Sequence, residues 1–313
     1  MRISKRPTLP TASTIIHRVI AQRQVSVVYQ PVVDLRTKRI FAYEALVRCQ
    51  VPELASPLAL FDAAVAGECA GELGRLIREI AVENVGSHAL FLNIHPAELN
   101  ERWIVQPDDP VFAHDRDVFL EITEGVPLSH FALCQSMLRE LRGRGVHLAV
   151  DDLGAGYSNL KYIADLHPRV VKLDRKLVTD LVGNSRMFSL VSGIVVLCKD
   201  LGALVVAEGI ETTEELEAVR DAGAQYGQGY LLARPEFPPP PIIWPVLGKR
   251  GPHSIRSPRS MPPKQSASNL SGRLSGPTSA RSEAGPASSR PPPSRRGSVP
   301  ARRSSRAPST RKK

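Results

Sequence analysis

The stretch VSVVYQPVVDLRTKRIFAYEALV, residues 25–47, decides the fold of this chain. It contains two apolar, β-branched runs, residues 25–33 and 40–47, of the kind that forms buried strands. Only the segment from Asp34 to Arg39 separates them, which is too short for the crossover helix that parallel neighbours require. The two runs therefore predict an antiparallel hairpin.

After the hairpin, short apolar runs alternate with longer amphipathic ones. The further predicted strands are Leu90–Ile94, Val118–Ile122, His147–Val150, Val170–Leu173, Leu204–Ala207 and Tyr226–Tyr230. The predicted helices are Ser56–Ala66, Glu72–Val85, Ser129–Arg142, Ser158–Asp165, Ser185–Leu201 and Thr212–Ala222. This alternation favours a mostly parallel sheet covered by helices. Eight strands in about 230 residues favour a closed (β/α) barrel, which the hairpin makes irregular.

Charge divides the chain. The 313 residues carry a net charge of +10, yet residues 245–313 hold sixteen Lys and Arg against one acid, Glu283. The remainder is mildly acidic, which disfavours a nucleic-acid-binding core. Residues 245–313 are rich in Ser, Pro and Arg and lack aromatic residues, so they predict a disordered basic tail. We expect a flexible N-terminus over residues 1–11 and a folded domain over residues 12–244.

Cysteine usage and hydropathy limit the class of protein. Four widely spaced cysteines form no CxxC pair, so a zinc knuckle is excluded and reduced, packed cysteines are expected. The N-terminus meets Pro7 and Pro10 where a signal peptide needs an apolar run. No stretch approaches the roughly 18 apolar residues of a membrane span. The sequence predicts no transmembrane segment and a cytoplasmic protein.

Polar residues recur at or near the ends of the predicted strands, where a barrel gathers side chains at one mouth. They are Glu44, Asn93, Glu121, Asp151, Asp152, Lys172, Glu208 and Gln228. Buried carboxylates and a buried lysine are unfavourable unless they are paired or bind metal. Oxygen ligands that include an Asn suit Mg²⁺ or Mn²⁺ better than zinc. A lysine among acids further suggests a water held near a metal pair, as in hydrolytic phosphate chemistry.

Simpler interpretations exist for each residue taken alone. A single acid after a strand often caps a helix, a lysine can reach solvent or pair with an acid, and an Asn can cap a turn. Residues 154–159 begin like a dinucleotide-binding loop but lack the third glycine, and no Ser-His-Asp pattern is present. The histidines at 95, 114, 147 and 167 share no spacing, and we interpret them as surface or structural residues.

These motifs together resemble the EAL-domain cyclic di-GMP phosphodiesterases over about residues 25–235. The matching segments are Tyr29-Gln30-Pro31-Val32-Val33-Asp34-Leu35, Glu44-Ala45-Leu46-Val47-Arg48, Phe91-Leu92-Asn93-Ile94, Leu120-Glu121-Ile122-Thr123-Glu124, Asp151-Asp152-Leu153-Gly154-Ala155-Gly156-Tyr157-Ser158, Val171-Lys172-Leu173-Asp174, Ala207-Glu208-Gly209-Ile210-Glu211-Thr212 and Gln228-Gly229-Tyr230. The resemblance implies a TIM-like barrel with one antiparallel strand.

The resemblance also implies a role for individual residues. One Mg²⁺ or Mn²⁺ ion would be held by four side chains: Glu44, Asn93, Glu121 and Asp151. Asp151 would bridge to a second ion near Asp152 and Glu208. Lys172 would position or deprotonate the attacking water, and Glu208 belongs with it to the catalytic set. Glu124 would brace the loop from Asp152 to Asn159, which in the family couples dimerisation to metal binding. The dinucleotide would be contacted by Gln30, Leu46, Arg48, Asp174, Gln228 and Pro235.

The implied activity is hydrolysis of cyclic di-GMP to linear pGpG. Cys49 stands where the family usually has an aromatic residue, Gln225 stands where it usually has an acid, and the segment between Arg48 and Glu72 is short. The alternative is a catalytically weak cyclic di-GMP receptor or scaffold whose basic tail anchors it to nucleic acid or anionic membrane. The charge of the tail predicts polyanion contact that weakens with salt.

Overall fold

The computed structural model describes residues 12–101, 103–123, 131–154 and 160–246. Within these residues, eight strands close into one barrel in chain order. Strand β1 (Val25–Asp34) pairs antiparallel with β2 (Arg39–Cys49) on one side and with β8 (Tyr226–Gly227) on the other. All other neighbours pair parallel. The predicted hairpin and the TIM-like barrel with one antiparallel strand are therefore confirmed.

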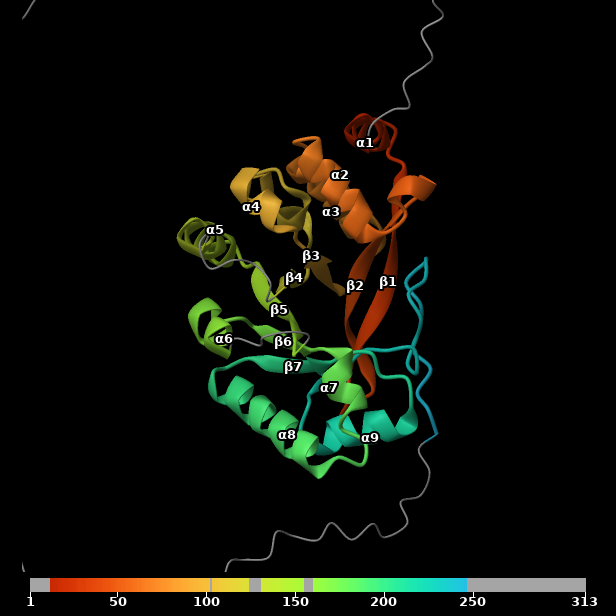
Figure 1. Cartoon of the computed structure of the whole chain (residues 1–313), viewed down its shortest axis with the longest axis vertical. Helices are drawn as coiled ribbons and strands as arrows, with labels where there is room; N and C mark the ends of the chain where they lie inside the picture. Colours follow the sequence, from red (N-terminus) through yellow and green to blue (C-terminus); the bar gives the residue numbers. More distant parts are fainter. Residues whose placement is uncertain (1–11, 102, 124–130, 155–159, 247–313) are drawn as a thin grey trace, which may run out of the picture. The chain divides into compact units, whose positions relative to one another are not determined.

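The remaining strands follow the expected alternation with helices. They are β3 (Ala89–Asn93), β4 (Val118–Thr123), β5 (His147–Leu153), β6 (Val170–Leu173) and β7 (Leu204–Ala207). The predicted helices are present as α2 (Pro57–Ala66), α3 (Ala70–Asn84), α5 (Phe131–Gly143), α6 (Leu160–Leu166), α8 (Ser185–Asp200) and α9 (Thr213–Asp221). Figure 1 shows these helices arranged around the outside of the strands.

Three helices were not expected from the sequence. They are α1 (Ala12–Ala21), α4 (Pro96–Glu101) and α7 (Arg175–Thr179), and three short 3₁₀ turns lie at Pro52–Leu54, Trp103–Val105 and Pro110–Ala113. Helix α1 is held by tertiary burial, since Ile16 and Val19 are fully buried in the core. Helices α4 and α7 have six and five residues and begin within three residues of a strand end, so they are too short to show a helical period. In α7, the Asp174 side chain caps the turn by accepting a hydrogen bond from the Lys176 N–H.

Strand β8 is shorter than the predicted run Tyr226–Tyr230. After Gly227 the chain leaves β1 and contacts the loop that follows β7, where Ile210 N donates to Gln228 O over 3.0 Å. Gly229 comes so close to this loop that a Cβ atom there would lie 2.1 Å from Ile210 O. This close approach ends the strand and leaves Gln228 at the mouth of the barrel.

The barrel interior at the amino ends of the parallel strands is filled with aromatic rings. Phe91 and Phe119 stack with centroids 4.4 Å apart, and Phe41 stacks on Tyr226 at 4.2 Å. Small residues such as Ala42 and Ala149, both fully buried, make room for these rings. The packed interior closes the barrel below the polar side chains, so any ligand must enter from the carboxyl ends of the strands.

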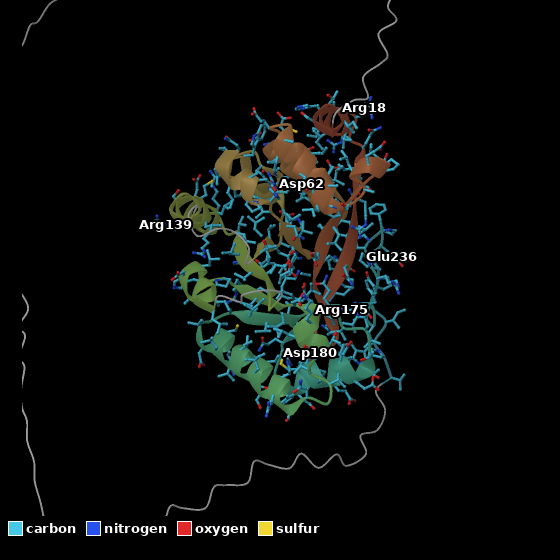
Figure 2. The ribbon with its side chains drawn as sticks, in the orientation of Figure 1. Arg18, Asp62, Arg139, Arg175, Asp180 and Glu236 are labelled. Atoms are coloured by element: carbon cyan, nitrogen blue, oxygen red, sulfur yellow. The ribbon has the colours of Figure 1, made fainter. Side chains whose placement is uncertain are left out.

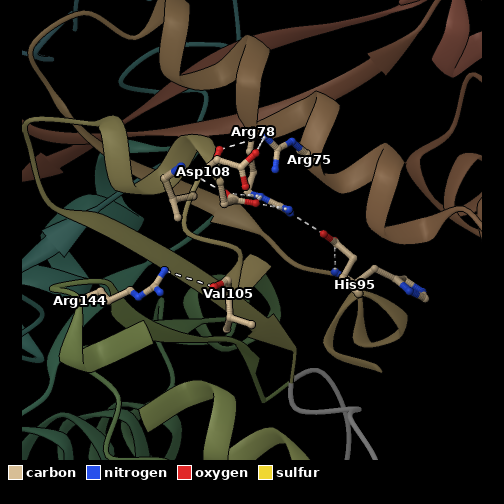
Figure 3. A network of polar contacts seen from close by, with 9 residues as sticks. Arg75, Arg78, His95, Val105, Asp108 and Arg144 are labelled. Carbon is tan, nitrogen blue, oxygen red and sulfur yellow. Dashed lines mark hydrogen bonds and ion pairs between the residues drawn. The ribbon is translucent and has the colours of Figure 1, made fainter. Parts of the chain in front are cut away.

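A buried ion cluster ties α3 to the segments that follow β3. The Arg78 guanidinium of α3 lies 2.5 Å from Glu98 Oε2 on α4 and 2.8 Å from Asp109 Oδ2. All three residues are buried, at 2% exposure or less. Figure 3 shows these contacts as dashed lines from Arg78. Because a buried ion left without its partner destabilises a fold strongly, this cluster fixes α4 against α3.

Several predictions concern parts of the chain that lie outside the described residues. These are the flexible N-terminus over residues 1–11 and almost all of the basic tail, residues 247–313. No helix among the described residues is long and apolar enough to cross a membrane, and the cytoplasmic location stays a prediction. Cys69 and Cys198 are buried and form no disulfide, as expected.

The ion cluster leaves no room for a side chain at Gly74 of α3. A Cβ atom at Gly74 would lie 1.8 Å from Glu98 Oε2, and that carboxylate cannot move away without leaving Arg78. We expect Gly74→Ala to lower the free energy of unfolding by about 2–4 kcal/mol. Urea denaturation followed by circular dichroism measures this change.

Gly193→Ala in α8 is the matched control, since nothing lies within 4 Å of a Cβ atom there. It should stabilise the protein by about 0.5–1 kcal/mol, the ordinary gain from replacing glycine inside a helix. Equal effects of the two substitutions would show that the ion cluster does not constrain Gly74.

Candidate active site

Each of the eight strands carries, or is directly followed by, a polar side chain at the same end of the barrel. In chain order these are Gln30, Glu44, Asn93, Glu121, Asp151, Lys172, Glu208 and Gln228. The register of the sheet aligns them, because Gln30 lies opposite Glu44 and Asn93 lies opposite Glu121. The convergence expected from the strand ends is thus what the topology produces.

Lys172 is the centre of this group. Its side chain is 1% exposed, and four carboxylate oxygens surround its ammonium. The distances from Nζ are 2.5 Å to Glu208 Oε1, 2.6 Å to Glu121 Oε1, 3.2 Å to Glu44 Oε2 and 3.3 Å to Asp151 Oδ1. Burial opposes the charge of Lys172, but the surrounding acids outweigh it and hold its pKa well above the ordinary value.

Two amide side chains orient Glu44, and a third is linked to one of them. Gln228 Nε2 donates to Glu44 Oε2 over 2.7 Å, and Asn93 Nδ2 donates to Glu44 Oε1 over 3.0 Å. Gln228 Nε2 also donates to Gln30 Oε1 over 3.0 Å, while Gln30 Nε2 donates to Ala233 O. Burial would raise the pKa of Glu44, but Lys172 and the hydrogen bonds from Gln228 and Asn93 outweigh it and lower that pKa. Because Asn93 donates through Nδ2, its Oδ1 stays available as a cation ligand.

Other carboxylate oxygens in the cluster lack such donors. Among the described residues, both oxygens of Glu121 and Oδ1 of Asp151 are buried without a hydrogen bond, although Lys172 is near. A buried acceptor without a donor is unfavourable. These atoms are oxygen ligands of the kind that a hard divalent cation prefers. The donor set therefore fits Mg²⁺ or Mn²⁺.

The arrangement of the acids agrees with more than one ion. Among the described residues, Asp151, Asp152 and Glu208 each offer a carboxylate oxygen within 4.8 Å of the others. Glu44, Glu121 and Asp151 gather on Lys172, so Asp151 belongs to both sets. When all are ionised, these five carboxylates and one ammonium leave four negative charges, which two divalent cations would balance.

Proton binding lowers this charge when cations are absent. Burial raises the pKa of Glu208 to about 8, with the charge of Asp151 adding to the effect. Burial likewise raises the pKa of Asp152 to about 6. The pKa of Glu121 is raised well above its ordinary value by burial and then by the charge of Glu44. Perturbed carboxylates of this kind are typical of functional sites.

Two adjoining cavities open onto the cluster. One, of about 310 Å³, is lined by Lys172, Asp151, Glu208 and the predicted substrate residues Gln30, Asp174 and Gln228. The other, of about 530 Å³, is mostly apolar and reaches the predicted substrate residue Arg48. Glu44, Leu46 and Asp152 line both cavities. Their volumes lie in the range that holds small organic ligands.

Sequence reasoning missed several side chains around these cavities. On the smaller cavity, Arg175 pairs with Glu211, and the partly exposed ring of Tyr230 is stacked by Arg234 at 4.3 Å. Figure 2 labels Arg175, which begins α7. Because Arg175 directly follows the predicted substrate residue Asp174, its place beside the cavity could have been predicted from the sequence.

The apolar cavity has an aromatic wall that the sequence did not reveal. Phe61 of α2 and His95 of the β3–α4 loop stack at 5.1 Å with planes 10° apart. Both rings line the cavity. The interpretation of His95 as merely structural is therefore incomplete. No spacing in the sequence links two residues that meet only through the packing of α2 on the barrel.

Two predicted site residues are not tested by this geometry. Pro235 does not line either cavity, although it lies two residues after Ala233, the acceptor for Gln30. Glu124 lies outside the described residues, as does most of the loop from Asp152 to Asn159. Both roles stay predictions.

The two substitutions that depart from the family pattern lie away from the cluster. Gln225 accepts from Val205 N over 2.7 Å and donates to Gly223 O over 3.0 Å, a pair of bonds that an acid cannot make. Cys49 ends β2 and lines neither cavity. Neither substitution removes a group from the mouth of the barrel.

A closed barrel with one reversed strand and an oxygen-rich cluster at its mouth is the arrangement of a metal-dependent barrel protein. The EAL domain family matches residues 14–235, and the chain belongs to that family. The cyclic di-GMP phosphodiesterase PA2567 of Pseudomonas aeruginosa is 33% identical over 224 residues, which are 67% of this chain and 38% of that protein. The chain spans about a third of the length of the curated relatives that it matches.

Solved structures of similar chains include metal complexes. Klebsiella pneumoniae BlrP1, in complex with manganese and cyclic di-GMP at pH 6, is 32% identical with a TM-score of 0.63, covering 72% of this chain and 59% of that one. The same protein with calcium and cyclic di-GMP at pH 8.0 is 31% identical with a TM-score of 0.63, covering 76% and 61%. Divalent cations thus accompany the dinucleotide in these EAL structures.

The raised pKa values predict that cation binding releases protons. A proton must leave Glu208 or Asp152 before its oxygens bind a cation, so Mn²⁺ affinity should be weak below pH 6 and rise as pH passes about 6 and then about 8. Calorimetric titration with Mn²⁺ at pH 7, in two buffers of different ionisation enthalpy, measures the released protons. Heats that do not depend on the buffer would show that the carboxylates are already ionised.

Proposed function

We propose that this EAL domain hydrolyses cyclic di-GMP to linear pGpG with the help of two Mg²⁺ or Mn²⁺ ions. The observation that carries the proposal is the buried Lys172 among four carboxylates, where Glu121 and Asp151 pair with its ammonium and Glu121 Oε2 is buried without a hydrogen-bond partner among the described residues. The similarity to PA2567 and to BlrP1 in complex with cyclic di-GMP supports the choice of substrate.

The ligand sets follow from the two groups of acids. The first ion would be held by Glu44, Asn93, Glu121 and Asp151. The second would be held by Asp151, Asp152 and Glu208, the group whose oxygens lie close together. When bound, such a pair of cations supplies Lewis acidity for the phosphodiester and activates water.

Lys172 has a positioning role in this proposal. Because its pKa is held high, its ammonium is a hydrogen-bond donor, which favours orienting the attacking water over removing its proton. Glu208 Oε1, 2.5 Å from Nζ, fixes the direction of that ammonium. Water adds across the P–O3′ bond: its oxygen joins the new 5′ phosphate, and the leaving 3′ oxygen gains a proton.

The remaining polar residues would hold the dinucleotide. Gln30, Asp174 and Gln228 line the cavity beside Lys172, while Arg48 lines the apolar cavity and Leu46 lines both. Pro235 is proposed as a further contact on the family resemblance alone. Hydrogen bonds from Gln228 to Glu44 and to Gln30 would couple substrate contact to the geometry of the cluster.

Two further proposals extend beyond the described residues. A homodimer through the loop from Asp152 to Asn159, braced by Glu124, is supported by the family resemblance. Polyanion contact by the tail is supported by its sixteen basic residues against one acid. Its partner would be nucleic acid or anionic lipid, and binding would weaken with added salt.

The metal role predicts that single ligand substitutions abolish turnover. Glu44→Ala or Asp151→Ala should reduce cyclic di-GMP hydrolysis in Mn²⁺ to background, because each removes an ion ligand. Glu214→Ala, at an exposed position in the first turn of α9, is the matched control and should hydrolyse at the parent rate. Circular dichroism verifies that the variants fold. Turnover at the parent rate in either Glu44→Ala or Asp151→Ala would contradict the two-ion assignment.

Lys172 separates catalysis from binding. Lys172→Ala should lower kcat by about 100-fold or more, the usual scale for loss of a positioned proton-handling group. Its Kd for cyclic di-GMP, measured by calorimetry in saturating Ca²⁺ that replaces the lost positive charge among the carboxylates, should stay within a few-fold of the parent value. Ca²⁺ suits this measurement because its looser coordination should support binding without hydrolysis. Parent-like kcat in Lys172→Ala would remove the lysine from the mechanism.

A further inference from the structure

His95 is held in place by contacts on several sides. Its Nδ1 accepts from Ala97 N over 3.2 Å, which puts the ring proton of the neutral imidazole on Nε2. Its ring stacks on Phe61, and its backbone N–H donates to Glu98 Oε1 over 2.9 Å. No hydrogen-bond partner of His95 Nε2 lies within the described residues. A half-buried imidazole is thus fixed with a free donor.

Helix capping explains only part of this arrangement. The Nδ1 contact and the Glu98 Oε1 contact together cap the start of α4, and Asn or Ser would cap it at least as well. Capping does not require an aromatic ring, a parallel stack on α2 or a place in a cavity wall. His95 has all three.

The ion cluster of Arg78 stands behind the same loop. Glu98 accepts from His95 N with one oxygen and from Arg78 with the other. Asp109 holds the opposite edge of the Arg78 guanidinium with bonds of 2.8–3.1 Å. In Figure 3, dashed lines lead from Arg78 through a carboxylate to the backbone of His95. A rigid support of this kind is what a preorganised binding residue needs.

The wall lies beside the candidate metal centre. Asn93, which orients Glu44, is two residues before His95, and the apolar cavity that His95 lines also contains Glu44 and Asp152. A ligand whose phosphate sits at the carboxylates would therefore place its next flat group in this cavity. Base–aromatic stacking stabilises such a group, and a ring N–H donor can meet an acceptor on the base edge.

We infer that the stacked pair of His95 and Phe61 is the wall that recognises one guanine base of the dinucleotide, and that Arg78 is a positioning residue which acts on it through Glu98. The inference rests on the proposed function for the identity of the substrate. It names residues that determine specificity, while the carboxylates and Lys172 perform the chemistry.

The test compares variants that remove the ring but keep the fold. His95→Asn keeps a side-chain cap for α4 and removes the imidazole, and Phe61→Leu keeps an apolar side chain and removes the ring. His114→Asn, at the opposite end of the barrel beside His88, is the matched control. Calorimetry in Ca²⁺ gives Kd for cyclic di-GMP, a separate titration gives Mn²⁺ affinity, and hydrolysis in Mn²⁺ gives kcat.

We expect His95→Asn and Phe61→Leu each to raise Kd by about 10-fold, the scale of one lost base contact. Mn²⁺ affinity and kcat should stay within about twofold of the parent, and His114→Asn should change nothing. If the parent protein binds cyclic di-GMP and both ring variants bind it with the same Kd, this inference is wrong and the proposed function stands. If the parent protein neither binds nor hydrolyses cyclic di-GMP, the proposed function is wrong as well.

The positioning role has its own readout. Arg78→Lys keeps the charge but loses the fork that grips Asp109, and Glu98→Gln keeps an acceptor for His95 N but weakens the pair with Arg78. Either change should raise Kd for cyclic di-GMP in the parent and have no further effect in the His95→Asn background. If Arg78→Lys does not fold, Glu98→Gln alone decides. Additive effects in the double variants would show that the cluster does not act through His95.

Discussion

Lys172 and the acids around it form the interaction on which the mouth of the barrel depends. Four carboxylates with oxygens within 3.3 Å of one buried ammonium would repel each other strongly if the ammonium were removed. The crowded acids raise the pKa of Lys172 against the opposing effect of its burial, while burial and the neighbouring acids raise the pKa values of Glu121 and Glu208. The ammonium of Lys172 offsets the repulsion among these carboxylates, and the negative charge that remains favours the binding of cations.

The barrel makes this crowding possible by supplying one polar residue from each strand. The reversal of β1 does not break the pattern, because its register still sets Gln30 opposite Glu44. Gln228 reaches the same point because β8 ends early, where Gly229 approaches Ile210. The aromatic interior below excludes ligands from the other end. Fold and site are therefore linked through the point at which each strand ends.

Much of this could be predicted from the sequence, and the reasons are local. The hairpin follows from the short segment between Asp34 and Arg39, and the place of Glu121 or Lys172 follows from strand ends that converge in any parallel barrel. The stacked pair of Phe61 and His95 could not be predicted, because only the packing of α2 beside the β3–α4 loop brings the rings together.

The ion cluster was hidden for a similar reason. Arg78, Glu98 and Asp109 look like ordinary surface charges in an amphipathic sequence, and their burial depends on how α3 and α4 meet. The short helix α7 and the early end of β8 were missed because single turns and close backbone contacts leave no periodic signal. Local patterns thus identified the groups to which we assign the chemistry, while tertiary contacts determine how those groups are held.

The most direct test of the account is hydrolysis of cyclic di-GMP by the purified full chain in Mn²⁺ and ¹⁸O-labelled water, with the products analysed by mass spectrometry. The account predicts linear pGpG with a single ¹⁸O atom in its 5′ phosphate, and no product after EDTA. Intact cyclic di-GMP in the presence of Mn²⁺, or turnover that resists EDTA, would contradict it.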